Sequence, residues 1–429
     1  MTDQLQSFSL SQRALRTKEQ PIGYLMAQAL YNPALISLAA GFVDYQTLPA
    51  KESSSLINEL LADPVLGERA MQYGTSAGLN ELRHQLLEHM AKLDGMSPSD
   101  LDASPDDVVI TTGSQQLLFV LTDLLVDVGD IVITEWPSYF VYTGTLTSAG
   151  AQVRAVEMDD QGMIPEKLES LLAEIANAGQ LHRVKIVYTC DYHQNPTGIT
   201  LSQERRPQIL DIVRKYSPDH RILLLEDAAY RELTYEGESP RSIKSYDTNN
   251  EFVALAQTFS KPFAPGLKTG YGLLPRDLVE PALLQKGNHD FGSNNLSLHV
   301  LSAAMRDGTY AQHVDVLKRT YANKRDAMLR ALDKEFGKQR DAGEVRWTQP
   351  TGGLYVYLTL ANEEDTGRSG KLFQRALSQG VLYVPGSYCF GPDETRTAPT
   401  NTMRLSFGVP TIENIQEGIK RLSAAVQGN

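Results

Sequence analysis

Short apolar runs alternate along the middle of the chain with segments in which apolar residues recur every three or four positions. The apolar runs predict strands, and they lie at 108–112, 130–135, 152–156, 185–189, 221–227 and 252–255. The helical patterns between them lie at 79–93, 117–125, 166–178 and 203–215. Because strands that alternate with helices form crossover units, residues 70 to 300 are predicted to form a mostly parallel sheet flanked by helices.

The two ends of the chain have a different pattern. Helical periodicity is present at 12–31 and 52–61, with a short strand at 35–40 between them. Beyond residue 271 the predicted helices are 277–288, 295–306, 310–335 and 411–427, and the predicted strands are 353–360, 381–385 and 403–407. We therefore expect a large domain over 66–309 and a smaller α+β domain over 310–429, completed by an N-terminal segment over 1–65.

Composition excludes several classes of protein. The chain has 429 residues, of which 41% are hydrophobic and 21% charged, and its net charge of −12 argues against nucleic acid or an anionic membrane as a partner. No apolar run approaches the ~18 residues of a membrane span. The polar N-terminus lacks the apolar core of a secretory signal, and Cys190 and Cys389 do not make a disulfide framework. We expect a cytoplasmic protein without a metal-ligand cluster.

The stretch from Thr258 through Ser260 to Lys261 carries the first candidate chemistry. It follows an apolar run, and a Pro/Gly-rich turn separates Lys261 from a second cation, Lys268. Ligands of open α/β sheets bind at such strand ends. A lysine that is desolvated or lies near another cation becomes a nucleophile that forms a Schiff base with a carbonyl. The alternative is a surface loop with two solvated lysines.

A strand, a glycine turn and a helix start follow one another around Gly113, Ser114 and Gln115. The free N–H groups and the dipole of a helix N-terminus attract a phosphate. A plain turn with a serine N-cap is an equally good interpretation.

Other strand ends carry further polar and aromatic residues. Asp227 ends a very apolar strand, where a carboxylate needs a cationic or N–H partner, and Tyr230 follows three residues later. Asn195 offers an amide donor. Tyr139 follows a proline turn and is suited to stacking on a flat heterocycle, whereas core packing is the competing role for its neighbours Trp136 and Phe140.

Two more residues have ordinary alternatives. Arg404 alternates with apolar neighbours on a strand and is able to bind a carboxylate with two parallel hydrogen bonds, although it also fits a solvated edge strand. Tyr73 lies in a loop of small residues, where most tyrosines simply pack.

Together these candidates match the requirements of pyridoxal 5′-phosphate. Its aldehyde reacts with a lysine, its protonated ring nitrogen needs a carboxylate, its 3′-oxygen needs donors and its phosphate needs a helix dipole and cations. The motifs are Gln72-Tyr73-Gly74, Gly113-Ser114-Gln115-Gln116, Pro137-Ser138-Tyr139, Asn195-Pro196-Thr197-Gly198, Asp227-Ala228-Ala229-Tyr230, Ser260-Lys261 and Arg404. In this order and spacing, the chain resembles the fold-type I, class I/II aminotransferases, especially the kynurenine/aminoadipate aminotransferase subgroup, over residues 20–425.

The resemblance implies a fold-type I transferase with a seven-stranded, mostly parallel sheet, a large domain that binds pyridoxal phosphate, and a homodimer with shared active sites. The implied catalytic residues are Lys261, which would form the internal aldimine and move the substrate proton, Asp227, which would pair with the ring nitrogen, and Tyr230. The implied cofactor-binding residues are Ser114, Gln115, Tyr139, Asn195, Asp227, Tyr230, Thr258, Ser260, Lys261, Lys268 and, from the second subunit, Tyr73. The implied substrate-binding residues are Arg404, Gly41 and Asn195.

The chain departs from the family pattern at two places. Lys268 stands where relatives usually carry arginine; lysine keeps the positive charge but loses the planar fork. The stretch 41–45 replaces a more usual Gly/Pro-rich segment of the substrate pocket.

The predicted reaction is transfer of an amino group from an L-amino acid to a 2-oxo acid such as 2-oxoglutarate or pyruvate. The alternatives are a pyridoxal phosphate enzyme that eliminates, decarboxylates or oxidises amino acids, and a non-enzymatic sensor. Related regulators fuse this fold to a winged helix, for which we expect the ~30 residues before the fold to be too few.

Overall fold

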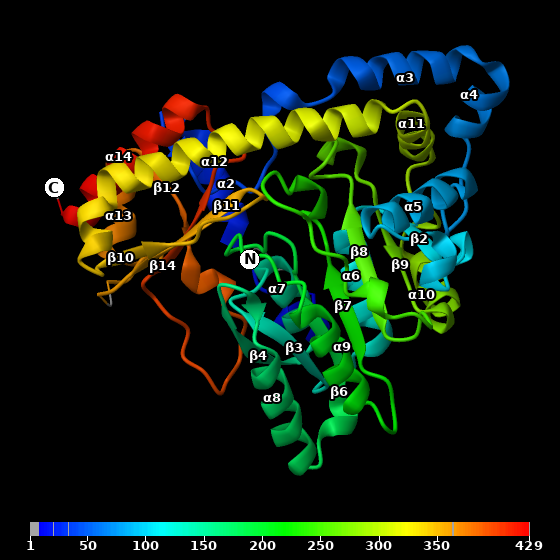
Figure 1. Cartoon of the computed structure of the whole chain (residues 1–429), viewed down its shortest axis with the longest axis horizontal. Coiled ribbons are helices and arrows are strands. Elements are labelled where there is room, and N and C mark those ends of the chain that lie inside the picture. The colour runs from blue at the N-terminus through cyan, green and yellow to red at the C-terminus, as the bar shows by residue number, and fades with distance from the viewer. Residues whose placement is uncertain (1–7, 20, 33, 363, 429) are drawn as a thin grey trace, which may run out of the picture.

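The computed structural model describes residues 8–19, 21–32, 34–362 and 364–428. In this part of the chain the largest sheet has the strand order β2-β9-β8-β7-β6-β3-β4-β5 (Figure 1). Its strands are β2 (Val108–Thr111), β3 (Ile131–Trp136), β4 (Gln152–Asp159), β5 (Gly162–Met163), β6 (Val184–Thr189), β7 (Leu223–Asp227), β8 (Val253–Thr258) and β9 (Gly270–Leu273). Five adjacent strands, β8, β7, β6, β3 and β4, are parallel, while β9 is antiparallel to both of its neighbours. The mostly parallel sheet is thus present, and the two-residue β5, which forms a hairpin with β4, adds an eighth strand to the expected seven.

Helices cover both faces of this sheet. They include α6 (Ser114–Leu125), α7 (Phe140–Ala149), α8 (Pro165–Asn177) and α9 (Arg205–Lys215). Leu223 and Leu225 of β7 pack in the core with α6 and α7, whereas Leu224 packs in the core with α8 and α9. Since side chains alternate along a strand, Asp227 belongs to the first face and Glu226 to the second.

A second, antiparallel sheet has the order β10-β11-β14-β13. Its strands are β10 (Val345–Trp347), β11 (Tyr355–Leu360), β13 (Val384–Pro385) and β14 (Thr402–Ser406), and the associated helices are α12 (Thr309–Asp341), α13 (Lys371–Ser378) and α14 (Ile412–Gln427). The long α12 runs from α11 (Asn295–Arg306) to α14 and so bridges the two ends of the molecule (Figure 1). Near the start of the chain, β1 (Ile36–Ser37) pairs in parallel with β12 (Val381–Leu382).

The remaining helices are α1 (Gln12–Arg16), α2 (Pro21–Tyr31), α3 (Ala50–Ala62), α4 (Pro64–Met71), α5 (Asn80–Leu93) and α10 (Arg276–Asp290). The single helix predicted over 12–31 is wrong, because Thr17, Lys18 and Glu19 separate α1 from α2; residue 20 lies outside the described residues, as do residues 1–7 and Pro33 of the predicted ends. Sequence periodicity missed α4, α7, β9 and β10. Helix α7 contains Thr, Gly and Val, which are weak helix formers, so packing against β4 and α6 rather than local propensity sustains it.

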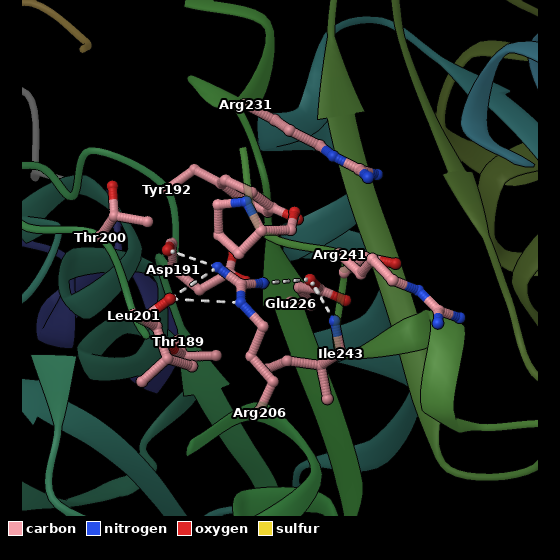
Figure 2. Close-up of polar contacts among 12 residues, drawn as sticks. Thr189, Asp191, Tyr192, Thr200, Leu201, Arg206, Glu226, Arg231, Arg241 and Ile243 are labelled. Atoms are coloured by element: carbon pink, nitrogen blue, oxygen red, sulfur yellow. Dashed lines mark hydrogen bonds and ion pairs between the residues drawn. The ribbon is translucent and has the colours of Figure 1, made fainter. Parts of the chain in front are cut away.

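A buried cluster of charges surrounds Arg206 beside β7 (Figure 2). It includes Glu226, which lies on the face of the sheet opposite that of Asp227 because side chains alternate along a strand. The guanidinium of Arg206 pairs with Asp191 and, at 3.4 Å, with Glu226, and its centre lies 4.3 Å from the ring centroid of Tyr192. Glu226 also accepts hydrogen bonds from the backbone N–H groups of Ile243 (2.8 Å) and Lys244 (2.9 Å). Burial raises the pKa of Glu226 well above its usual value, and the Asp191 carboxylate raises it further. The Arg206 guanidinium is therefore the shared counterion of two carboxyl groups that are buried away from water.

Replacing Arg206 with methionine is expected to lower the stability of the protein by about 3–5 kcal/mol, because two buried carboxyl groups lose their counterion. Thermal unfolding measures the effect. Lys215→Met on the same helix is the control: the Lys215 side chain is 62% exposed and its pair with Glu169 should contribute little to stability. Equal melting temperatures for the two variants would contradict the prediction.

Candidate active site

A cavity of about 390 Å³ lies at the carboxyl ends of β6, β7 and β8. Its walls come from distant parts of the chain, including the segment after β1, the start of α6, the strand ends of the large sheet, and β11 and β14 of the second sheet. The sequence-predicted residues that line it are Gly41, Ser114, Gln115, Tyr139, Asn195, Asp227, Tyr230, Thr258, Ser260, Lys261, Lys268 and Arg404. Of the predicted set, only Tyr73 lies elsewhere.

Lys261 follows β8, at the carboxyl end of a central strand. Its Nζ donates a hydrogen bond to the backbone carbonyl of Gly41 (2.8 Å) and lies 5.6 Å from the centroid of the Tyr230 ring. Burial lowers the pKa of the Lys261 amine below its usual value, and the nearby Arg404 cation lowers it further. A larger fraction of neutral, nucleophilic amine follows at neutral pH, so the interpretation as a solvated surface lysine is wrong.

Asp227 ends β7 and is 3% exposed. Its Oδ2 accepts a hydrogen bond from the hydroxyl of Tyr188 (2.9 Å), and its Oδ1 accepts one from the backbone N–H of Ala229 (3.2 Å). Burial raises the pKa of Asp227 to about 6, while these hydrogen bonds and the Lys261 cation act in the opposite direction. The site therefore holds a carboxylate that would gain from a positively charged partner in the cavity.

The opposite end of the cavity is suited to an anion. Gly113, with a φ of 77°, is the N-cap of α6 and makes no side-chain cap, so Ser114 is the first helical residue and not the N-cap. There is no acidic residue in the first turn of α6. Lys268 is an exposed residue that lines the cavity wall. Ser260 lies beside Thr258, whose hydroxyl donates to the Ser260 hydroxyl (3.0 Å). Helix dipole, hydroxyls and ammonium together favour a phosphate.

Two residues of α10 support this anion-binding end, and sequence reasoning missed them. Lys286 is fully buried, and its Nζ donates to Asp290 (2.9 Å). The other carboxylate oxygen of Asp290 accepts hydrogen bonds from Gln116 (2.8 Å) and Thr112 (3.1 Å), on either side of the α6 start. Because the partners are 174 positions or more apart in sequence, periodicity alone could not reveal the contact.

Arg404 is 1% exposed on β14, which is an interior strand of its sheet, so the solvated edge-strand interpretation is wrong. Its Nη1 donates to Oδ1 of Asn195 (2.7 Å) and its Nη2 donates to the carbonyl of Ala39 (2.8 Å). Its Nε is buried and has no hydrogen-bond partner among the described residues. An unpaired N–H of a guanidinium at a cavity wall is suited to a carboxylate ligand.

The aromatic residues of the predicted site divide into two groups. Tyr139, at the N-cap of α7, lines the cavity, and so does Phe140, whose ring lies 5.6 Å from the Arg404 guanidinium. Trp136 does not line it and instead packs on Phe390, with ring centroids 4.7 Å apart. Core packing therefore describes Trp136, whereas Phe140 both packs in the core and lines the cavity.

Tyr355 of β11 is the most central residue that the sequence reading missed. Its hydroxyl lies 2.9 Å from that of Tyr230, and the Arg404 guanidinium lies 4.3 Å from its ring centroid. The apolar run of β11 does not single out Tyr355, and only the pairing of β11 with β14 brings it to Arg404. Phe42 and Cys190 also line the cavity without having been predicted there.

Tyr73 is 83% exposed and lies against Phe291, with ring centroids 5.8 Å apart in an edge-to-face arrangement. It borders a different surface hollow, lined also by Arg69, Asn295 and Arg306. Within one protomer it is therefore separate from the other predicted site residues.

The residues of the cavity fit pyridoxal phosphate. A half-buried lysine with a lowered pKa and a buried carboxyl group face the same cavity, and a helix start near the exposed Lys268 offers a phosphate site. Among the described residues, no group of three or more His, Cys, Asp or Glu side chains is arranged to hold a metal ion. None of the described helices has the length and apolar character that a membrane crossing requires.

Comparison with known proteins agrees with this chemistry. The family model described as aminotransferase class I and II matches residues 33–422. The chain is 34% identical to an uncharacterised aminotransferase of Saccharolobus solfataricus over 92% of each chain, and 32% identical to aromatic-amino-acid aminotransferase 1 of Thermococcus litoralis over 97% of this chain and 94% of that one. The crystal structure of Pyrococcus horikoshii kynurenine aminotransferase superposes with a TM-score of 0.88 at 31% identity, covering 98% of this chain and 97% of that chain.

Fold and cavity together define a pyridoxal phosphate-dependent enzyme of fold type I. The chain belongs to the class I and II aminotransferases, so it transfers amino groups by means of this cofactor.

Proposed function

We propose that the cavity binds the cofactor between Lys261, which attaches it, and the groups at its two ends. Asp227 would hold a proton on the ring nitrogen, Asn195 and Tyr230 would donate to the 3′-oxygen, and Tyr139 would stack on the ring. Ser114, Gln115, Thr258, Ser260 and Lys268 would bind the phosphate. When bound, the cofactor supplies an electron sink for the carbon from which Lys261 removes and to which it returns a proton.

We propose further that Arg404 binds the α-carboxylate of both the L-amino acid donor and the 2-oxo acid acceptor, for which 2-oxoglutarate and pyruvate are the first candidates. Gly41 and Asn195 would lie beside the substrate. A Cβ at Gly41 would lie 2.6 Å from the Tyr355 hydroxyl, which supports a requirement for glycine at this wall.

A single observation carries the proposal: one cavity gathers Lys261, Asp227, Asn195, Tyr230 and Arg404 from the carboxyl ends of β7 and β8, the turn that follows β6 and the middle of β14. Its test is a screen of single amino acids against the purified protein, without an acceptor. A competent donor should release one equivalent of its 2-oxo acid per active site and convert the cofactor to its amine form, and added 2-oxoglutarate or pyruvate should reverse the change. Release of ammonia or CO₂ in place of the oxo acid would contradict it.

We propose that the protein is a homodimer in which Tyr73 reaches the phosphate of the partner's site. Leu61 of α3 and Val65, Leu66 and Met71 of α4 are exposed shortly before Tyr73 in the chain, and these exposed apolar residues support an interface with a second copy.

Mixing two inactive variants tests the shared site. Lys261→Ala and Tyr73→Ala are each expected to have little activity. After co-refolding or co-expression, half of the dimers are mixed and one of their two sites is intact, so about a quarter of the wild-type activity should return. The control is the mixture of Lys261→Ala with Asp227→Ala, whose damaged residues lie in the same protomer's cavity; mixed dimers then have no intact site. Equal recovery in both mixtures, or none in the first, would contradict the shared site.

We propose the domain limits 1–65, 66–309 and 310–429 and a cytoplasmic location. The pairing of β1 with β12 supports assigning the N-terminal segment to the smaller domain, and α12 begins at Thr309. Both cysteines are free and buried, which supports a reducing compartment.

A further inference from the structure

Two tyrosine hydroxyls meet at the wall of the active-site cavity. Tyr230 follows β7 and Tyr355 lies on β11, so the two phenols come from different sheets, yet their hydroxyl oxygens are 2.9 Å apart. Their rings meet edge to face, with centroids 5.6 Å apart. Both residues are at most 4% exposed, and both line the cavity.

The direction of this hydrogen bond follows from counting protons. Each neutral phenol has one O–H to donate. Burial raises the pKa of Tyr230 well above its usual value, and the Tyr355 hydroxyl raises it further, so the Tyr230 hydroxyl keeps its proton. If Tyr230 donates that proton to the 3′-oxygen of the cofactor, it has none left for Tyr355. Tyr355 must then be the donor and Tyr230 the acceptor.

Other contacts hold Tyr355 in the orientation that this donation requires. The Arg404 guanidinium covers its ring at 4.3 Å from the centroid. Gly41 leaves space for its hydroxyl, because any Cβ at residue 41 would approach that oxygen to 2.6 Å. The Gly41 carbonyl also accepts the hydrogen bond from Lys261. Tyr355 thus lies against Tyr230, Arg404 and Gly41, and its proposed role requires no proton exchange of its own.

We propose that Tyr355 is a positioning residue for the transfer reaction: its hydroxyl donates to Tyr230 and so directs the single Tyr230 proton toward the cofactor, while its ring fixes the Arg404 guanidinium. The proposal rests on the role proposed above for Tyr230. The hydroxyl and the ring of Tyr355 therefore have separate roles. The hydroxyl acts on the cofactor through Tyr230, and the ring acts on the substrate carboxylate through Arg404.

Tyr355→Phe tests the hydroxyl, with Tyr357→Phe as the matched control. Tyr357 lies two residues further along β11, is also buried, and its hydroxyl bonds to Thr402 outside the cavity (2.9 Å). The readout is the pH midpoint at which the visible absorption of the cofactor bound to the enzyme changes. The hydrogen bond that Tyr230 donates stabilises the negatively charged 3′-oxygen. Without the Tyr355 hydroxyl, the Tyr230 proton is no longer directed toward that oxygen, so the midpoint should rise by about 0.4–1 pH unit in Tyr355→Phe and stay unchanged in Tyr357→Phe.

Two further variants distinguish the possible failures. Tyr230→Phe should raise the midpoint at least as far, and Tyr355→Phe added to it should produce no further rise, because Tyr355 acts through Tyr230. If Tyr230→Phe leaves the midpoint unchanged, the role proposed for Tyr230 fails. If Tyr230→Phe shifts it but Tyr355→Phe matches Tyr357→Phe, or if the two shifts add, the inference about Tyr355 is overturned.

The ring has its own readout. Tyr355→Phe keeps the stacking surface and should leave the KM of the amino donor within about twofold, whereas Tyr355→Leu should raise that KM by about 3- to 30-fold. An equal KM for both variants would overturn the assignment of the ring to Arg404.

Discussion

Replacing Lys261 with alanine is expected to reduce turnover by about 10⁴-fold or more, because in the proposed mechanism this one side chain supplies both the covalent attachment and the proton transfer. The buried position of its amine and its lowered pKa suit it to both tasks. Borohydride reduction of the wild-type enzyme should fix the cofactor to the peptide that contains Lys261, and mass spectrometry of a digest detects the modified peptide.

The control for this result is Lys215→Met, which removes an exposed lysine of α9 and should leave both turnover and labelling unchanged. Lys261→Arg retains a cation but should also be inactive, since a guanidinium stays protonated at neutral pH and does not attack the aldehyde. Substantial turnover by Lys261→Ala, or labelling of another lysine in the wild type, would contradict the assignment.

Asp227→Asn is expected to lower kcat by about 10²- to 10³-fold while the cofactor still binds. The neutral amide cannot stabilise a proton on the ring nitrogen, so the ring loses its capacity as an electron sink. Steady-state rates with a competent donor, together with cofactor content by absorption, measure the two effects separately. Normal turnover by Asp227→Asn would exclude Asp227 as the partner of the ring nitrogen.

The neighbouring acid is the matched control. Glu226 is equally buried but faces α9, where it contacts Arg206 and two backbone N–H groups. Glu226→Gln should therefore affect melting temperature but leave kcat within about twofold, since the strand places the two carboxyl groups on opposite faces.

The raised pKa of Asp227 also predicts that the stability of the cofactor-free protein depends on pH. Burial raises its pKa from 3.8 to about 6, so the folded state retains this proton where the unfolded chain has lost it. The corresponding stability is fully present below about pH 4 and is lost as the pH rises through about 6. In thermal unfolding of the cofactor-free proteins, the melting temperature of the wild type should therefore fall as the pH rises through about 6, and that of Asp227→Asn should lack this fall.

Several features of the site could be predicted because they are local. An apolar run that ends in Asp227, or in Lys261 after β8, marks a strand end, and strand ends of a parallel sheet meet at one edge. The glycine turn before Ser114 likewise places a helix N-terminus beside that edge. The alternation of strands and helices was sufficient to predict the mostly parallel sheet.

Other features depend on pairings that no local pattern encodes. The contact of Tyr355 with Arg404 requires the register of β11 against β14, and the support of the α6 start by Asp290 joins residues 174 positions or more apart. Helix α7 forms despite weak propensity because it packs between α6 and β4.

The amino-acid sequence by itself determined the type of sheet and the positions of Lys261 and Asp227 near strand ends, because hydrophobic periodicity and strand ends are local properties of the chain. Only the tertiary structure decided that Arg404 is buried, that the hydroxyls of Tyr355 and Tyr230 lie together, and that Tyr73 lies outside the cavity of its own protomer. The physical reason is that desolvation and hydrogen bonding depend on which distant segments pack together, and that packing is settled only when the whole chain folds.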